Sequence, residues 1–182
     1  MYRCIAADSF PGVPDFPCSR IWKSIIPTKI CFFMWAVFHK RIPTIDLLKR
    51  KGLELANRCV LCCKEEESDD HLFTEFDYAK KVWSFIKNRC REAYQPQDDI
   101  LLAIRNWSDS LPNTIDGWFC FCLLHATCWH LWLERNRCIF QDKSLLSSTI
   151  ARRIANAVIE WVVIQAKVDK SQGVDWLKNR FD

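Results

Sequence analysis

Two cysteines and a histidine are spaced in this sequence like the ligands of a structural zinc ion. Cys59 and Cys62 are separated by two residues, so a tight turn can present both sulfurs to one metal ion from the same side. His71 follows at the start of an expected helix, which is a usual place for a third ligand. The pattern therefore predicts Cys59, Cys62 and His71 as ligands of a zinc ion.

A tetrahedral site needs a fourth ligand, and the sequence does not supply an obvious one. The expected position, about one helical turn after His71, is occupied by Phe76. Cys63 adjoins the cysteine pair, but neighbouring residues seldom point into one coordination sphere, so Cys63 is only a weak substitute. A second interpretation stays open, in which the two cysteines and the histidine pack a loop and bind no metal.

The elements that must position these residues are helices, and the sequence predicts an all-α fold. Residues 53–68 lack periodicity, so we expect a zinc-knuckle-like loop there, with a short hairpin as an alternative. Gly52 stands where the helix before this loop should end. The expected starts of helices before and after the loop are Ser19, Thr28, Thr44, Asp69 and Asp77.

A helical tail is expected after a linker around Pro96. A short helix over residues 100–107 precedes the longest helix, which we place at residues 114–140 with a wide apolar face. The last helix should begin at Ser147 or Ser148. We find no apolar window long enough to cross a membrane and no N-terminal secretory signal, so we expect an intracellular chain without a membrane partner. The sequence does not distinguish nucleus from cytoplasm.

Charge is unevenly distributed, although the formal net charge is only +4. Residues 40–64 are mainly basic, whereas residues 65–79 carry acidic groups and no basic one. Two readings are compatible with this pattern: two solvated faces of opposite sign, or a basic surface that faces phosphate.

Motifs of common enzyme classes are missing from the sequence. It contains no glycine-rich phosphate loop, no G-x-S-x-G nucleophile motif and no H-E-x-x-H metalloprotease motif, and Asp69-Asp70 lies outside the context of a polymerase. We therefore expect a chain that is not an enzyme.

The order of several short motifs resembles the reverse-transcriptase zinc-binding domain, which lies at the C-terminal end of plant non-LTR (LINE-type) retrotransposon polyproteins. The motifs that carry the resemblance are Ile21-Trp22-Lys23, residues 26–35, residues 41–48, Cys59-Val60-Leu61-Cys62, His71-Leu72-Phe73, Tyr78-Ala79 and Val82-Trp83. Residues 129–140 are similar to the segment that commonly follows this domain. The resemblance implies an irregular arm at 1–19, the zinc-binding domain at 20–92, a linker with a short helix at 93–112 and a helical region at 113–182.

The resemblance also implies ligands and a function. The first three ligands of the family fall on Cys59, Cys62 and His71, and its last cysteine falls on Phe76, where this chain departs from the family. The implied function is an accessory module, a stand-alone remnant that binds the RNA or DNA backbone, with a polymerase domain as a further partner and no catalysis of its own. The residues expected to contact phosphate are Lys40, Arg41, Lys49, Arg50, Lys51 and Arg58. The alternative is a relic or interaction domain that binds neither metal nor nucleic acid.

Overall fold

The described part of the chain is helical. The structure, a computed structural model, describes residues 22, 25–87, 99–102, 104 and 115–165. No strand occurs among these residues, which confirms the all-α prediction for them. The elements are α2 (Thr28–Phe38), α3 (Ile45–Arg50), the π-helical turn η1 (His71–Glu75), α4 (Asp77–Lys87), α6 (Ile115–Gln141) and α7 (Ser147–Gln165).

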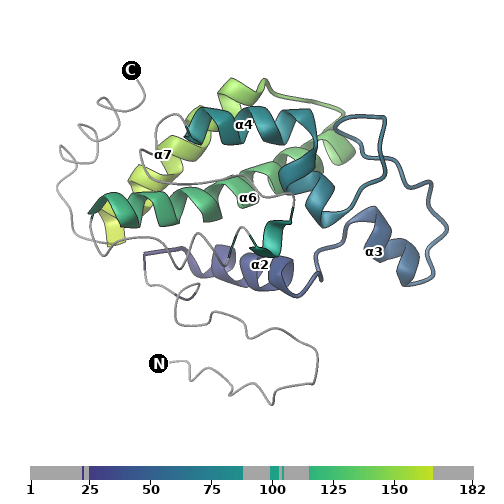
Figure 1. Cartoon of the computed structure of the whole chain (residues 1–182), viewed down its shortest axis with the longest axis horizontal. Coiled ribbons are helices and arrows are strands. Elements are labelled where there is room, and N and C mark those ends of the chain that lie inside the picture. The colour runs from purple at the N-terminus through teal and green to yellow at the C-terminus, as the bar shows by residue number, and fades with distance from the viewer. Residues whose placement is uncertain (1–21, 23–24, 88–98, 103, 105–114, 166–182) are drawn as a thin grey trace, which may run out of the picture.

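The long helix α6 is the centre of the fold (Figure 1). Helices α4 and α7 pack against each other and against α6, whereas α2 contacts α6 from the other side. The short helix α3 lies at one end of the molecule, beside the loop that carries the cysteines. None of the described helices is long and apolar enough to span a bilayer.

Aromatic side chains join these helices into one core. The ring of Phe33 in α2 lies edge-on to Trp129 of α6 at 5.2 Å between centroids, and edge-on to Phe73 of η1 at 6.3 Å. The indole Nε1–H of Trp83 in α4 donates to the carbonyl of Phe73 at 2.6 Å. Such pairs stabilise the fold beyond the apolar area that they bury. The turn η1, which carries His71, is thereby fixed against both α2 and α4.

Most of the expected helix boundaries agree with the structure. Helices begin at Thr28 and directly after Thr44, and α4 begins at Asp77. Gly52 has a φ of 91°, a left-handed conformation that glycine adopts without strain, and it follows the end of α3. The helix expected after Ser19 is not found at its described residues, because Trp22 lies in a bend and Ile25 in a turn. The rest of that helix, the linker around Pro96 and the three expected domain boundaries lie outside the described residues.

The acid-rich stretch 65–79 is not a uniformly solvated face, and this part of the expectation is wrong. Glu67 is fully buried, and its carboxylate receives two hydrogen bonds from the guanidinium of Arg135 in α6. Asp69 is also buried, and its Oδ1 accepts a hydrogen bond from the hydroxyl of Thr44 at 3.2 Å. Local composition predicts that Glu67 and Asp69 are solvent-exposed, but contacts with residues far away in the sequence bury both side chains.

Candidate metal centre

A tight turn presents the two cysteine thiols on one side of the loop. The backbone N–H of Cys63 donates to the carbonyl of Cys59 at 2.8 Å, and the N–H of Cys59 donates to the carbonyl of Glu65 at 2.8 Å. Cys63 has a φ of 56°, and its carbonyl accepts a hydrogen bond from Nε of Arg58 at 2.7 Å. These bonds fix the turn from Cys59 to Glu65.

The imidazole of His71 faces the two thiols. Its Nε2 lies 3.4 Å from Sγ of Cys62, and the ligand atoms of Cys59, Cys62 and His71 all lie within 4.8 Å of one another. Atoms this close can bind a single metal ion after small side-chain movements, because each zinc–ligand bond is only about 2.0–2.3 Å long. The structure therefore brings together the three side chains predicted from the sequence spacing.

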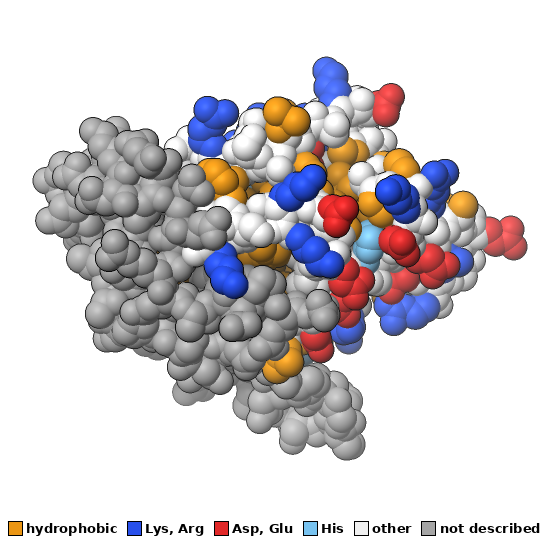
Figure 2. Space-filling model, turned by 45° about the horizontal axis from the view of Figure 1, so that its top comes forward, with side chains coloured by type: hydrophobic (Ala, Val, Ile, Leu, Met, Phe, Trp, Pro, Cys, Tyr) orange, Lys and Arg blue, Asp and Glu red, His pale blue; other side chains and the backbone are white. Residues whose placement is uncertain are grey.

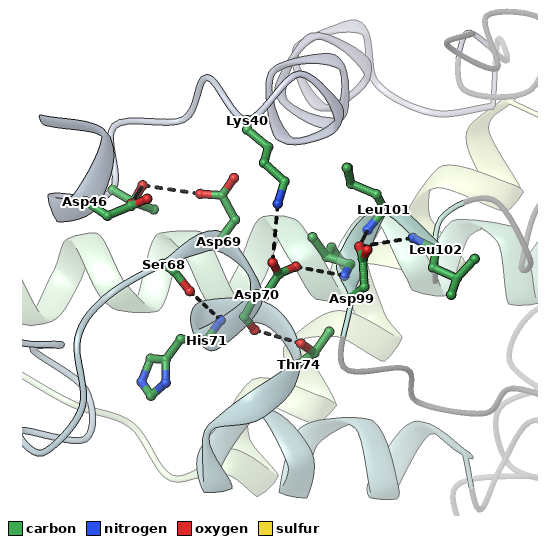
Figure 3. Close-up of polar contacts among 12 residues, drawn as sticks. Lys40, Asp46, Ser68, Asp69, Asp70, His71, Thr74, Asp99, Leu101 and Leu102 are labelled. Carbon is green, nitrogen blue, oxygen red and sulfur yellow. Dashed lines mark hydrogen bonds and ion pairs between the residues drawn. The ribbon is translucent and has the colours of Figure 1, made fainter. Parts of the chain in front are cut away.

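Backbone contacts of η1 set the position of His71 (Figure 3). The hydroxyl of Ser68 accepts a hydrogen bond from the N–H of His71 at 3.0 Å, and the hydroxyl of Thr74 donates to the carbonyl of Asp70 at 2.7 Å. The carboxylate of Asp70 in turn pairs with Lys40 and accepts from the N–H of Ile100. In Figure 3 the ring of His71 points away from these contacts, toward the side of the cysteine loop.

The second ring nitrogen of His71 faces a carboxylate. Nδ1 of His71 lies 3.9 Å from Oε2 of Glu75, four residues further along η1. Histidines that bind metals usually have such a group at the nitrogen that does not bind, where it orients the ring. Glu75 is not among the residues predicted from the sequence, although its spacing of four residues from His71 is a helical signal.

The two thiols have different electrostatic environments. Burial raises the pKa of Cys59 to about 11. Burial also acts to raise the pKa of Cys62, but the backbone N–H groups of Glu65 and Lys64 stabilise its thiolate, and the net result is a pKa below the ordinary value. Cys62 is thus the thiol that ionises more readily.

The position of the missing fourth ligand is filled by an aromatic stack. Phe76 is buried, and its ring stacks on the His71 ring at 5.5 Å and on the Tyr78 ring at 5.8 Å. Cys63 does not join the cluster; it is exposed, and its Sγ contacts the carbonyl of Val60 at 3.5 Å. Within the described residues the cluster therefore has three ligands, which fit a zinc ion but leave its coordination incomplete.

An open cavity of about 950 Å³ adjoins the cluster. Its walls come from the cysteine loop, from η1 and the start of α4, and from the connection between α6 and α7. Cys62, His71 and Phe76 line it, and so does Cys138 of α6. No local pattern in the sequence indicates that Cys138 lies here, because the contact depends on the packing of α6.

The six basic residues expected to contact phosphate are all exposed. Lys40 pairs with Asp70 at 3.4 Å, and Arg50 pairs with Asp46 of the same helix at 3.0 Å. Arg41 lies over the ring of Trp35 at 6.0 Å. Lys49 and Lys51, at the end of α3, have no ion-pair partner among the described side chains. Their role in binding nucleic acid stays a prediction.

Comparison with known protein families gives a match over the N-terminal part of the chain. Residues 2–83 match the family described as zinc-binding in reverse transcriptase. The match includes the cysteine pair, His71 and Phe76. Neither the curated proteins nor the solved structures gave a match.

Proposed function

We propose that this chain, whose residues 2–83 match the family described as zinc-binding in reverse transcriptase, is a retroelement-derived accessory module that binds one zinc ion and the nucleic-acid backbone. The observation that carries the proposal is the cluster of Cys59, Cys62 and His71 inside the matched segment. The family is zinc-binding rather than catalytic, and we propose no catalysis by the module itself. Its origin in a plant non-LTR element is part of the proposal and rests on the order of the sequence motifs.

Zinc would link the cysteine loop to η1. The loop is closed by its own hydrogen bonds, and η1 is fixed by α2 and α4, so a metal ion bound by Cys59, Cys62 and His71 joins two elements that are already in place. Metal binding that is coupled to folding stabilises the folded state, and the thiols release protons as they bind. The role that we propose for zinc is therefore structural.

The exposed basic side chains at the end of α3 would contact phosphate. Lys49 and Lys51 project from one end of a short helix, and Arg41 lies in the turn after α2. Burial of Glu67 and Asp69 reduces the negative charge that a phosphate would meet on the neighbouring loop. Contacts of this kind bind the backbone without reading the base sequence, and they weaken as salt rises.

A second candidate is a structural or interaction module that binds neither metal nor nucleic acid. Phe76 favours it, because a buried ring stacked on His71 can fill the site in place of a ligand. The exposed acids Glu65, Glu66, Glu75 and Asp77 also favour it, since they would repel phosphate near the loop.

Zinc content distinguishes the two candidates. Zinc per chain would be measured by mass spectrometry for the purified chain, for Phe76→Cys, which restores the fourth ligand, and for Cys62→Ser, which removes one of three. We expect zinc in the unchanged chain, tighter binding in Phe76→Cys and none in Cys62→Ser. Zinc in Phe76→Cys but not in the unchanged chain would favour the second candidate. Zinc in neither the unchanged chain nor Phe76→Cys would exclude the metal site.

Nucleic-acid binding needs a separate test. Fluorescence anisotropy with a labelled single-stranded RNA and DNA would be recorded over a range of salt concentrations. The double variant Lys49→Glu/Lys51→Glu should bind more weakly. The slope of the logarithm of the binding constant against the logarithm of the salt concentration should fall in magnitude by about two, roughly one for each phosphate that the variant no longer neutralises. Lys80→Glu/Lys87→Glu on α4 makes the same charge change at exposed sites and serves as the control. Equal weakening in both variants would contradict a role for α3.

A further inference from the structure

We propose that a metal ion held by Cys59, Cys62 and His71 keeps one exchangeable coordination position, which takes the thiolate of a small charged thiol from solution. The inference rests on the proposed zinc site and adds to it the class of ligand that completes the site. It follows from three features of this chain: the number of donors, the access from the cavity and the charges that line the cavity.

The described side chains offer three donors and no fourth. The ligand atoms of Cys59, Cys62 and His71 lie within 4.8 Å of one another, and no other thiol, imidazole or carboxylate of the described residues joins this group. Phe76 has no donor atom, and its stack on the His71 ring keeps it in the core. A tetrahedral ion held by three protein ligands has one position left for a ligand from solution.

The cluster can be reached from the cavity. Cys62 and His71 both line this space of about 950 Å³, whereas Cys59 is fully buried behind them. The connection between α6 and α7 forms the opposite wall, through residues 142–147. The volume exceeds that of one bound water by a factor of some tens, so a small organic molecule can enter beside the candidate metal ligands.

The chemistry of the site favours a thiolate. Zinc binds thiolate sulfur well, and three thiolates with one imidazole is one of the ordinary donor sets of structural zinc sites. The cavity is lined by both signs of charge, with Lys64, Lys81 and Lys143 on one hand and Glu65, Glu75, Asp77 and Asp142 on the other. Figure 2 shows basic and acidic side chains interspersed in the same way over one face of the molecule. A thiol that carries ammonium and carboxylate groups, such as glutathione, matches this mixture.

The proposed step is a ligand exchange. With a metal ion held by Cys59, Cys62 and His71, the thiol would give its proton to the buffer and its sulfur would take the position that a water otherwise fills. Nothing is oxidised or reduced.

Cobalt in place of zinc makes the exchange visible. The unchanged chain would be loaded with Co²⁺ in buffer free of thiols, and glutathione would then be added while the sulfur-to-cobalt charge-transfer absorption is recorded. We expect a saturable rise of about one half, because two thiolates become three around the same metal ion. The cobalt should stay with the chain after desalting.

Matched variants test whether the thiol enters the open position. Phe76→Cys fills this position from the chain itself, so glutathione should leave its spectrum unchanged. Phe76→His does the same with a nitrogen ligand and keeps a ring against His71, which covers the case that Phe76→Cys does not fold. Cys63→Ser and Cys138→Ser remove the two other thiols near the cavity, and both should respond like the unchanged chain.

The possible outcomes separate this inference from the proposed function. If the chain binds cobalt and glutathione leaves the spectrum unchanged, or if glutathione removes the cobalt, the exchangeable position is contradicted and the metal site remains. If the Phe76 variants respond as strongly as the unchanged chain, the thiol binds elsewhere and the inference is also wrong. If the unchanged chain binds no cobalt at all, both proposals fall.

Discussion

Glu67 and Arg135 form a buried, two-point ion pair across the fold. Nη2 of Arg135 lies 2.7 Å from Oε1 of Glu67, and Nε lies 3.1 Å from Oε2. The same carboxylate accepts a hydrogen bond from the N–H of Ile45 at the start of α3. One acidic side chain in the loop before His71 thus connects the cysteine loop and α3 to the central helix α6.

Removing one partner of this pair should strongly destabilise the chain. Arg135→Met leaves the carboxylate of Glu67 buried without its cation, and such changes cost about 3–5 kcal/mol. The free energy of unfolding would be measured by urea denaturation. Arg50→Met, which breaks the exposed pair with Asp46 inside α3, is the control and should cost less than about 1 kcal/mol. Equal costs for the two variants would show that the buried pair does not hold the elements together.

His125 should make the chain sensitive to acid. It is fully buried in α6, its Nδ1 lies 3.0 Å from the carbonyl of Phe121, and its Nε2 has no partner among the described residues. Burial lowers the pKa of His125 to about 4. The unfolded chain therefore binds a proton at this histidine more readily than the folded chain does. The stability that neutral His125 contributes is complete above the unfolded pKa of about 6.5, and it is lost as the pH falls toward 4.

The variant His125→Leu isolates this effect. A shift of this size corresponds to about 3 kcal/mol, so the loss of stability between pH 6.5 and pH 4 should shrink by an amount of this order. It should not vanish, because burial and the nearby Arg153 lower the pKa of His130 to about 4 as well. Urea denaturation of metal-free protein at several pH values gives the measurement, with the half-buried His39 replaced by Gln as control. An unchanged pH profile in His125→Leu would refute the assignment.

Local sequence signals account for most of the helices and for the candidate metal ligands. Thr28, Thr44 and Asp77 stand at or directly before the first residue of a helix. Gly52, with its positive φ, follows the end of α3. Helix start and stop signals depend on residues within a few positions of the boundary, so the sequence shows them directly. The spacing of Cys59 and Cys62 likewise fixes a turn through nearby backbone bonds. Interactions between residues close in the sequence determine these helix boundaries and this turn, so both can be predicted from the sequence.

Contacts between distant segments could not be predicted. The acid block reads as a solvated face, yet Glu67 finds its partner 68 residues later in Arg135. The cavity beside the cluster depends on Cys138 and the connection after α6, which no spacing rule relates to the cysteine pair. The π-helical form of η1 is not predicted either. The N–H of Phe76 donates to the carbonyl of His71, and the rings of the same two residues stack in the core, so the local backbone form depends on tertiary packing.

Zinc should lower the reactivity of the half-buried thiol of Cys62 and leave the exposed thiol of its neighbour Cys63 unchanged. In metal-free folded protein, Cys63 is exposed and Cys62 has a lowered pKa, so both should react quickly with iodoacetamide. Burial raises the pKa of Cys122 and Cys128, which should react only after unfolding. Added zinc should protect Cys62 and leave Cys63 reactive, as read by peptide mass spectrometry. Protection of Cys63 as well would identify it as a fourth ligand.

Glu75 should support zinc binding without touching the metal. Its Oε2 lies 3.9 Å from Nδ1 of His71, beyond hydrogen-bond distance, while Nε2 of the same ring faces the thiol of Cys62. Loss of such a partner typically weakens metal binding 10- to 100-fold, and this long contact places the expected effect of Glu75→Ala near tenfold. Zinc affinity would be measured by competition with a chelator, with Glu66→Ala as a control that removes an equal charge from an exposed site nearby. Equal weakening in both variants would mean that net charge, rather than the orientation of His71, accounts for the effect.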